Sequence, residues 1–247
     1  MTFTFKKNYR IELAPTLDKH YYYVYETLKG KEKLIGCFPS ATTVLNAYPF
    51  SEQLVKWIAQ KGYNESREYR DEAGRQGTKI HKAIEDLLGG AGLDKEGYLL
   101  AEWNKIVSFS RWHDEFKPEI IKLEMPVFSK KLGVAGRTDC IARINGENYI
   151  IDWKSSRSIH NSYYLQIAAY AQAVEEMTDL KIENTAVLQM GAPNKNGYRF
   201  VIEPDWRKNL DVFKSIYNTW QYDGAKEGAG KIVPPVLVLP DKLKLDL

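Results

Sequence analysis

Charged side chains gather in one stretch, residues 133–156, with a spacing that could hold a metal ion. Asn145 and Gly146 form the strongest two-residue signal for a β-hairpin, because a type I′ turn needs positive φ at both positions. A turn there places Asp139 directly opposite Asp152 on the neighbouring strand. Facing carboxylates repel one another unless a cation lies between them, and Mg²⁺ or Mn²⁺ prefers carboxylate oxygens. The stretch therefore predicts a divalent-cation site.

Two basic residues would share this site. Lys154 follows Asp152 by two positions and so points to the same face of its strand, and Arg137 lies opposite Lys154. The alternative interpretation is an ordinary solvated sheet face that carries four charges. The strand around Asp152, YIIDWK, is apolar, however, and charged residues are scarce in such strands unless they are used.

The sequence on either side predicts the elements that would position these residues. Apolar runs bounded by turn residues indicate strands, and apolar spacings of three and four indicate helices. The predicted strands are residues 21–27, 34–38, 120–129, 133–144, 147–156, 183–191 and 198–204. The predicted helices are 51–61, 66–88, 95–116, 163–177 and 205–222, with Ser40 capping a helical turn from Ala41 and an extended tail from Asp223. This order predicts a mixed sheet covered by helices.

The composition excludes several classes of protein. The two cysteines, Cys37 and Cys140, stand far apart, so the chain alone cannot supply a disulfide framework or a four-cysteine metal cluster. There is no GxxxxGK[ST] loop, so no NTP-driven motor is expected. No apolar run approaches the ~18 residues of a membrane span, and the first residues have no signal-peptide core. The net charge of +3 decides nothing about a nucleic-acid partner.

Four motifs together resemble a known family. GRTD, followed after 12 residues by DWKSS, resembles motifs II and III of the PD-(D/E)XK nuclease superfamily in its RecB-like branch. RQGTKIHKAIEDLL at 75–88 resembles the GT-x-x-H helix upstream of these motifs, and YYLQIAAYAQA resembles the Q-x-x-x-Y helix downstream. FPSATTVLNAYP is similar to the opening of phage and mitochondrial genome maintenance exonucleases. The motifs occur in the family's order over residues 38–175.

The resemblance implies an α/β (α+β) fold with a restriction-endonuclease-like core, a central mixed β-sheet flanked by helices. We expect one nuclease domain over residues 1–247. Its core would span residues 66–222, with an N-terminal hairpin and helical elaboration at 1–65 and the extended tail at 223–247.

The resemblance also implies a set of metal ligands. Asp139, Asp152 and the imidazole of His81 would bind the ion directly, with the main-chain carbonyl of Trp153 as a further ligand. Glu85, one helical turn after His81, would orient His81 or bind through water, unless it is an ordinary solvated helix residue. Glu124 would add a metal or water contact, unless it is a charge at the edge of its strand.

Further residues would act on the substrate by the same resemblance. Lys154 would hold and help deprotonate the attacking water or stabilise charge in the transition state. Gln166 and Tyr170 would contact Lys154 or a phosphate, although an ordinary packed helix face is the alternative. Basic and aromatic residues near the site would follow the DNA, unless they form a solvated rim: Arg137, Arg157, Trp153, Tyr163 and Tyr164.

Together these features predict a metal-dependent DNA exonuclease that acts on strand ends in recombination, repair or phage replication. We expect Mg²⁺ or Mn²⁺ as cofactor and DNA, single-stranded or at strand ends, as partner, with a recombinase or helicase in another chain. We expect no membrane partner and a cytoplasmic location, in a bacterium or a phage-infected host cell. The alternatives are a structure-selective or restriction-like endonuclease and a non-catalytic DNA-binding module. That module should have lost Asp139, Asp152 or Lys154, and all three are present.

Overall fold

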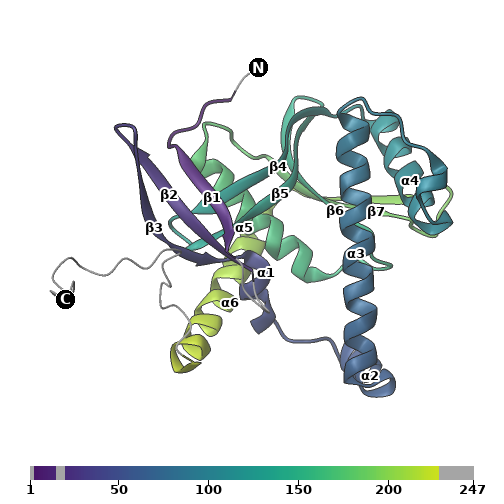
Figure 1. Ribbon diagram of the computed structural model, residues 1–247, viewed down its shortest axis with the longest axis horizontal. Coiled ribbons are helices and arrows are strands. Elements are labelled where there is room, and N and C mark those ends of the chain that lie inside the picture. The colour runs from purple at the N-terminus through teal and green to yellow at the C-terminus, as the bar shows by residue number, and fades with distance from the viewer. Residues whose placement is uncertain (1–2, 15–19, 228–247) are drawn as a thin grey trace, which may run out of the picture.

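A five-stranded mixed sheet, ordered β4-β5-β6-β7-β8, forms the centre of the computed structural model, which describes residues 3–14 and 20–227 (Figure 1). Its strands are β4 (Glu119–Ser129), β5 (Val134–Ile144), β6 (Glu147–Lys154), β7 (Asn184–Met190) and β8 (Tyr198–Glu203). Neighbouring strands are antiparallel except β6 and β7, which are parallel and joined through a crossover helix. The predicted mixed sheet is confirmed.

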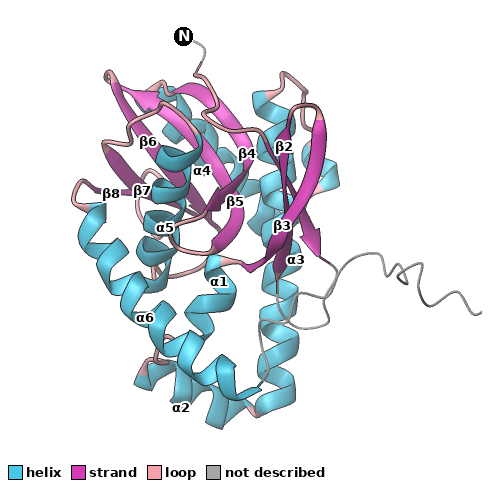
Figure 2. Cartoon of the chain, turned by 90° about the vertical axis from the view of Figure 1, so that its left-hand side faces the viewer, coloured by secondary structure: helices cyan, strands magenta, loops and turns pink. Residues whose placement is uncertain are grey.

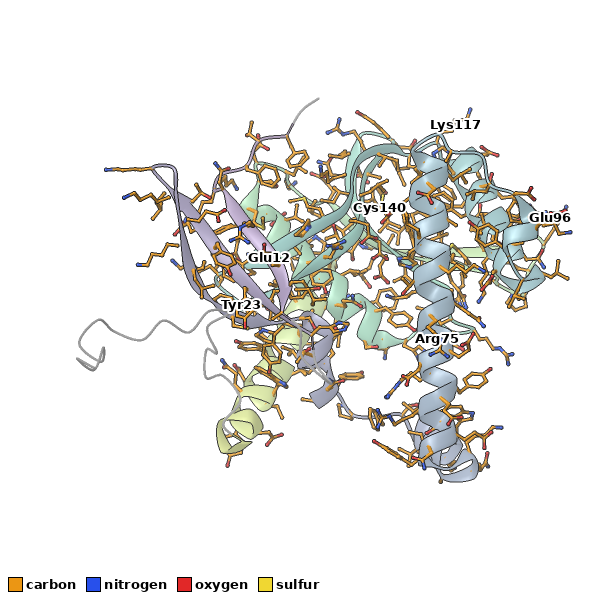
Figure 3. The ribbon with its side chains drawn as sticks, viewed as in Figure 1. Glu12, Tyr23, Arg75, Glu96, Lys117 and Cys140 are labelled. Carbon is orange, nitrogen blue, oxygen red and sulfur yellow. The ribbon has the colours of Figure 1, made fainter. Side chains whose placement is uncertain are left out.

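Helices cover both faces of this sheet. On one face, α3 (Tyr63–Leu88) and α4 (Leu100–Phe116) pack on an apolar cluster that includes Ile80, Phe109 and Cys140. On the other face, α5 (Asn161–Met177) and α6 (Trp206–Glu227) pack side by side on a second cluster (Figure 2). Figure 3 shows the side chain of Cys140 between the strands and α3. It also shows Arg75 on the part of α3 that extends past the sheet toward α2 (Glu52–Lys61).

A second, antiparallel sheet of β1 (Tyr9–Ala14), β2 (Tyr21–Leu28) and β3 (Lys31–Pro39) packs against β4 and β5. It is followed by α1 (Ala41–Val44), whose first turn is capped by the predicted Ser40: its hydroxyl accepts a hydrogen bond from the Thr43 N–H. The predicted hairpin at 21–38 is confirmed, and β1 was not foreseen.

The hairpin of β5 and β6 has the predicted turn and register. Asn145 and Gly146 both have positive φ, 51° and 88°, as a type I′ turn requires. The ladder runs from Ile144 paired with Glu147 to Cys140 paired with Ile151. This register brings Asp139 and Asp152 to the point where the ladder ends.

Several element boundaries differ from the expectation. The helix predicted over 95–116 is a 3₁₀ turn at Lys95–Gly97 followed by α4, and α3 begins at Tyr63 instead of residue 66. The last helix continues to Glu227, so the tail expected from Asp223 is helical at its start, and its remainder lies outside the described residues. No helix in the described ranges has both the length and the apolar character that a bilayer crossing requires.

Candidate metal centre

Three side chains from three elements converge at the opening between β5 and β6. They are His81 from α3, Glu124 from β4 and Asp139 from β5. The Nδ1 atom of His81 lies 4.0 Å from Glu124 Oε1 and 3.8 Å from Asp139 Oδ1, and the potential ligand atoms all lie within 4.8 Å of one another. An imidazole nitrogen with two carboxylate oxygens is a donor set that suits Mn²⁺ or Mg²⁺. This trio can therefore hold a divalent cation.

Glu124 reaches the trio because the backbone of β4 is distorted there. Its φ is +45°, in the left-handed region that a residue with a side chain seldom adopts. Leu123, before it, packs with the cluster under α3, whereas Met125, after it, packs with the cluster under α5. The strand thus changes its packing partner at Glu124. Backbone strain of this kind is often found at functional sites.

The imidazole of His81 is oriented by the main chain of β6. Its Nε2 donates a hydrogen bond to the Trp153 carbonyl, 2.9 Å away, which leaves Nδ1 facing the two carboxylates. Burial alone would lower the pKa of His81, but Glu124 and Asp139 outweigh burial and raise the pKa to about 9. Without a metal, a proton therefore occupies Nδ1 at neutral pH, at the position from which the nitrogen would bind an ion.

The main-chain pairing of β5 with β6 ends at Cys140 and Ile151, and beyond that point the side chain of Asp139 accepts a main-chain hydrogen bond of β6. Its Oδ2 accepts a hydrogen bond from the Trp153 N–H at 2.8 Å. Burial and the nearby charge of Asp152 raise the pKa of Asp139 to about 6, with His81 and Lys154 opposing the shift. The ionised form of Asp139 is thus destabilised in the metal-free protein, and a bound cation would remove this destabilisation.

Asp152 is held by Lys154. The ammonium donates to Asp152 Oδ1 at 2.9 Å and lies 2.8 Å from Oδ2. Burial alone would lower the pKa of Lys154, but Asp152 and Asp139 outweigh it and raise the pKa, so Lys154 is a cation. The structure brings Asp152 beside Asp139 but not into the trio, where Glu124 stands instead.

A cavity of about 390 Å³ opens beside the trio, and His81, Trp153 and Lys154 are part of its lining. The ammonium of Lys154 lies 4.7 Å above the ring of Tyr163, whose hydroxyl donates to Ser156 Oγ at 3.3 Å. The other lining residues include polar groups that sequence reasoning missed: Gln76, Thr78, Lys105, Ser155 and Ser156. No carboxylate is among the described residues that line it.

Residues 53–215 match the family model described as the PD-(D/E)XK nuclease superfamily. The chain belongs to this superfamily. Its nucleases generally use divalent metal ions, and the trio supplies donor atoms for one. The predicted family and fold class are confirmed.

Individual relatives are similar over part of the chain. Mitochondrial genome maintenance exonuclease 1 of Mus musculus is 30% identical over 156 residues, which cover 55% of this chain and 44% of the relative. Its Homo sapiens counterpart is 26% identical over 166 residues, which cover 59% of this chain and 46% of the relative. The chain thus spans about half the length of these relatives. A crystal structure of a candidate exonuclease from Eubacterium rectale is similar at a TM-score of 0.43 and 14% identity, over 71% of this chain and 80% of that one.

Of two further residues that the superfamily resemblance indicated, Glu85 lies outside the trio, whereas Tyr170 lies within electrostatic reach of Asp139 and Asp152. The carboxylate of Glu85 lies 3.8 Å from Lys82 Nζ, and the structure does not bring it into the trio. Tyr170 is buried against β5, where a Cβ on Gly136 would come within 2.5 Å of its hydroxyl. Burial raises the pKa of Tyr170, with a hydrogen bond from Gln166 opposing the shift. The ring of Tyr170 thus packs directly on the backbone of Gly136, where a larger residue would clash with it.

Of the five residues predicted to follow DNA, three lie at or near the site and two do not offer a side chain to the cavity. Tyr163 lines the cavity, the Arg137 guanidinium lies 3.7 Å from Glu124 Oε2, and Arg157 is exposed next to the cavity. The predicted stacking of a base on Trp153 is wrong, because its ring is fully buried in the cluster under α3. Tyr164 lies near Arg199 and Glu203 of β8, outside the cavity lining.

Metal binding is expected to weaken in acid because the ion competes with protons. The pKa of His81 is about 9 and that of Asp139 about 6, and both groups must be deprotonated to bind. Between pH 6 and 9, Mn²⁺ affinity should rise about tenfold per pH unit, and below pH 6 more steeply. Titration calorimetry in buffers of different ionisation enthalpy measures the released proton. His81→Gln should abolish that release, and the control His113→Gln should keep it. A pH-independent affinity would contradict this assignment.

Asp139→Asn is expected to stabilise the metal-free protein and to weaken metal binding. The amide oxygen can still accept the Trp153 N–H, while the buried negative charge is lost. Because the pKa of Asp139 is raised in the folded state, its ionised form lowers stability above pH 6. At pH 8 the substitution should add roughly 3 kcal/mol to the free energy of unfolding, measured by urea titration with chelator present. The stabilisation should fade below pH 4, and Asp94→Asn should show none of it.

Proposed function

We propose that this protein is a metal-dependent DNA exonuclease, which hydrolyses phosphodiester bonds from strand ends with Mg²⁺ or Mn²⁺ bound at the trio. One observation supports the chemistry most directly. The Lys154 ammonium is held by Asp152 beside His81, Glu124 and Asp139, and it lines an open cavity. A cation site next to a fixed ammonium suits a substrate that is an anion and becomes more negative during reaction.

The chain's own residues would divide the work. A bound divalent ion would polarise the scissile phosphate and lower the pKa of water. His81, Glu124 and Asp139 would hold that ion, with the Trp153 main chain fixing His81 and Asp139. Asp152 would hold Lys154 so that its ammonium donates to the phosphate or to the attacking water. Because this geometry exists before substrate arrives, little reorganisation is needed during the reaction.

The relatives favour an exonuclease, and the cavity has room for one nucleotide-sized group of a strand. A volume of about 390 Å³ suits a nucleotide-sized group. The curated relatives carry exonuclease in their names. Selection would rest on phosphate contacts and stacking, so affinity should fall with salt and vary little with sequence.

Linear and circular substrates should separate the exonuclease from an endonuclease. With Mg²⁺ or Mn²⁺, end-labelled linear single-stranded DNA should be shortened to oligonucleotides, because a free end can enter the site. Covalently closed single-stranded circles of the same sequence should persist. The Asp139→Asn variant is the control for contaminating nuclease. If circles are cut as fast as linear DNA, the protein is an endonuclease, and the assignment of the metal centre is unaffected.

Lys154→Ala should separate binding from chemistry. The variant keeps the trio, so Mn²⁺ and DNA should still bind, while the single-turnover rate should fall about 10²–10³-fold. Lys154→Arg should not restore the rate, because a planar guanidinium cannot replace a compact ammonium between Asp152 and Tyr163. The control Lys208→Ala changes a lysine whose side chain is 83% exposed. A Lys154→Ala variant with the parent rate would remove Lys154 from the mechanism.

A further inference from the structure

Lys105 on α4 is a cation that makes no direct ion pair within the described residues, although the charge of Glu102 acts on it from a distance. It is half-buried and lines the cavity that Lys154 and His81 also line. Within the described residues, no carboxylate forms an ion pair with it. The acidic residue one turn earlier on α4, Glu102, is already paired with Lys79 at 2.7 Å and accepts the Leu99 N–H. Partial burial without an ion-pair partner carries a cost in free energy, so an anion from outside the chain would stabilise Lys105.

The side chain of Lys105 is held in place along its stem. It lies across the backbone of Gly191, where a Cβ would come within 3.0 Å of its Cγ and 3.4 Å of its Cε. Gly191 has a φ of +77°, so glycine is favoured there for the backbone as well. This contact directs the stem of Lys105 and distinguishes it from a solvated surface lysine, which would lose more rotamer freedom on binding.

The surroundings of Lys105 favour an anion. Hydroxyl and amide groups of Gln76, Thr78, Ser155 and Ser156 line the same cavity, and no carboxylate does so among the described residues. Burial lowers the pKa of Lys105, the charge of Glu102 opposes this shift, and the charge of Arg157 adds to it. Lys105 and Arg157 therefore repel each other, and an anion bound in the cavity would offset that repulsion. Phosphate, with several acceptor oxygens, matches this set of donors.

We propose that Lys105 binds the DNA phosphate adjacent to the one being cleaved, an inference that rests on the proposed function. A strand in the cavity would present one phosphate to Lys154 and the trio and the neighbouring phosphate to Lys105. That neighbour is an internal diester or the terminal phosphate of the strand. Lys105 would then be a substrate-positioning residue that fixes which linkage meets the metal centre.

Lys105→Met tests this proposal because methionine keeps an unbranched stem over Gly191 and removes the charge. The Kd for single-stranded DNA, measured in the Lys154→Ala background, should rise on the order of tenfold. The slope of log Kd against log salt should fall by about 0.7, as expected for one lost phosphate contact. In the parent protein KM should rise with kcat little changed, and Lys105→Arg should restore most of the affinity. The control Lys208→Met should change none of these quantities.

Replacing single phosphates of the oligonucleotide by uncharged linkages identifies the phosphate that Lys105 contacts. Oligonucleotides carrying a single methylphosphonate at successive positions should show one position at which Lys105→Met no longer weakens binding. Substrates with and without a terminal phosphate distinguish a terminal from an internal phosphate. An equal loss on every substrate, or no loss at all, would overturn the proposal. Failure of the parent protein to cut any DNA would instead refute the proposed function, so the two failures are distinguishable.

Discussion

Mutual repulsion between carboxylates that the sheet brings together is the constraint on which the candidate site depends. Glu124, Asp139 and Asp152 come from three adjacent strands to one place, and burial together with the charge of Asp152 raises the pKa of Asp139. His81 from α3 and Lys154 from β6 supply the opposing charges. The docking of α3 on the sheet and the separation of β5 from β6 are both needed to bring these groups together. The repulsion that destabilises the metal-free protein is relieved when a cation binds, and this relief adds to the affinity for the cation.

The strand β6 carries three consecutive residues with three different tasks. Asp152 holds Lys154, and Lys154 faces the cavity. Trp153 lies between them with its ring in the core, while its N–H and carbonyl hold Asp139 and His81. A residue that belongs to the core by its side chain therefore belongs to the metal centre by its main chain. The rigidity of the apolar cluster is passed directly to two of the side chains that would bind the ion.

The local parts of the site were predictable from the sequence, and the long-range parts were not. The Asn145–Gly146 turn determines the register of β5 and β6, so the positions of Asp139, Asp152 and Lys154 followed from the turn chemistry. The left-handed conformation of Glu124 has no local signal, because glutamate does not favour it. Burial of the Trp153 ring depends on where α3 and α4 pack on the sheet, and the spacing of apolar residues in the sequence does not predict that position. Lys105 was missed for the same reason: α4 lies beside the site only after the chain has folded.

The turn at Asn145 and Gly146 lies about 20 Å from the metal centre along the hairpin, yet the centre depends on its length. On its other side β6 is locked in register with β7, where Asp152 pairs with Val187. Because β5 is likewise held in register by β4, a one-residue insertion or deletion in the turn would break one of these pairings. If β5 shifted, Thr138 or Cys140 would take the place of Asp139. Neither side chain can replace a carboxylate. Tolerance to changes in length should be as low at this solvent-exposed turn as to substitution of the candidate metal ligands themselves.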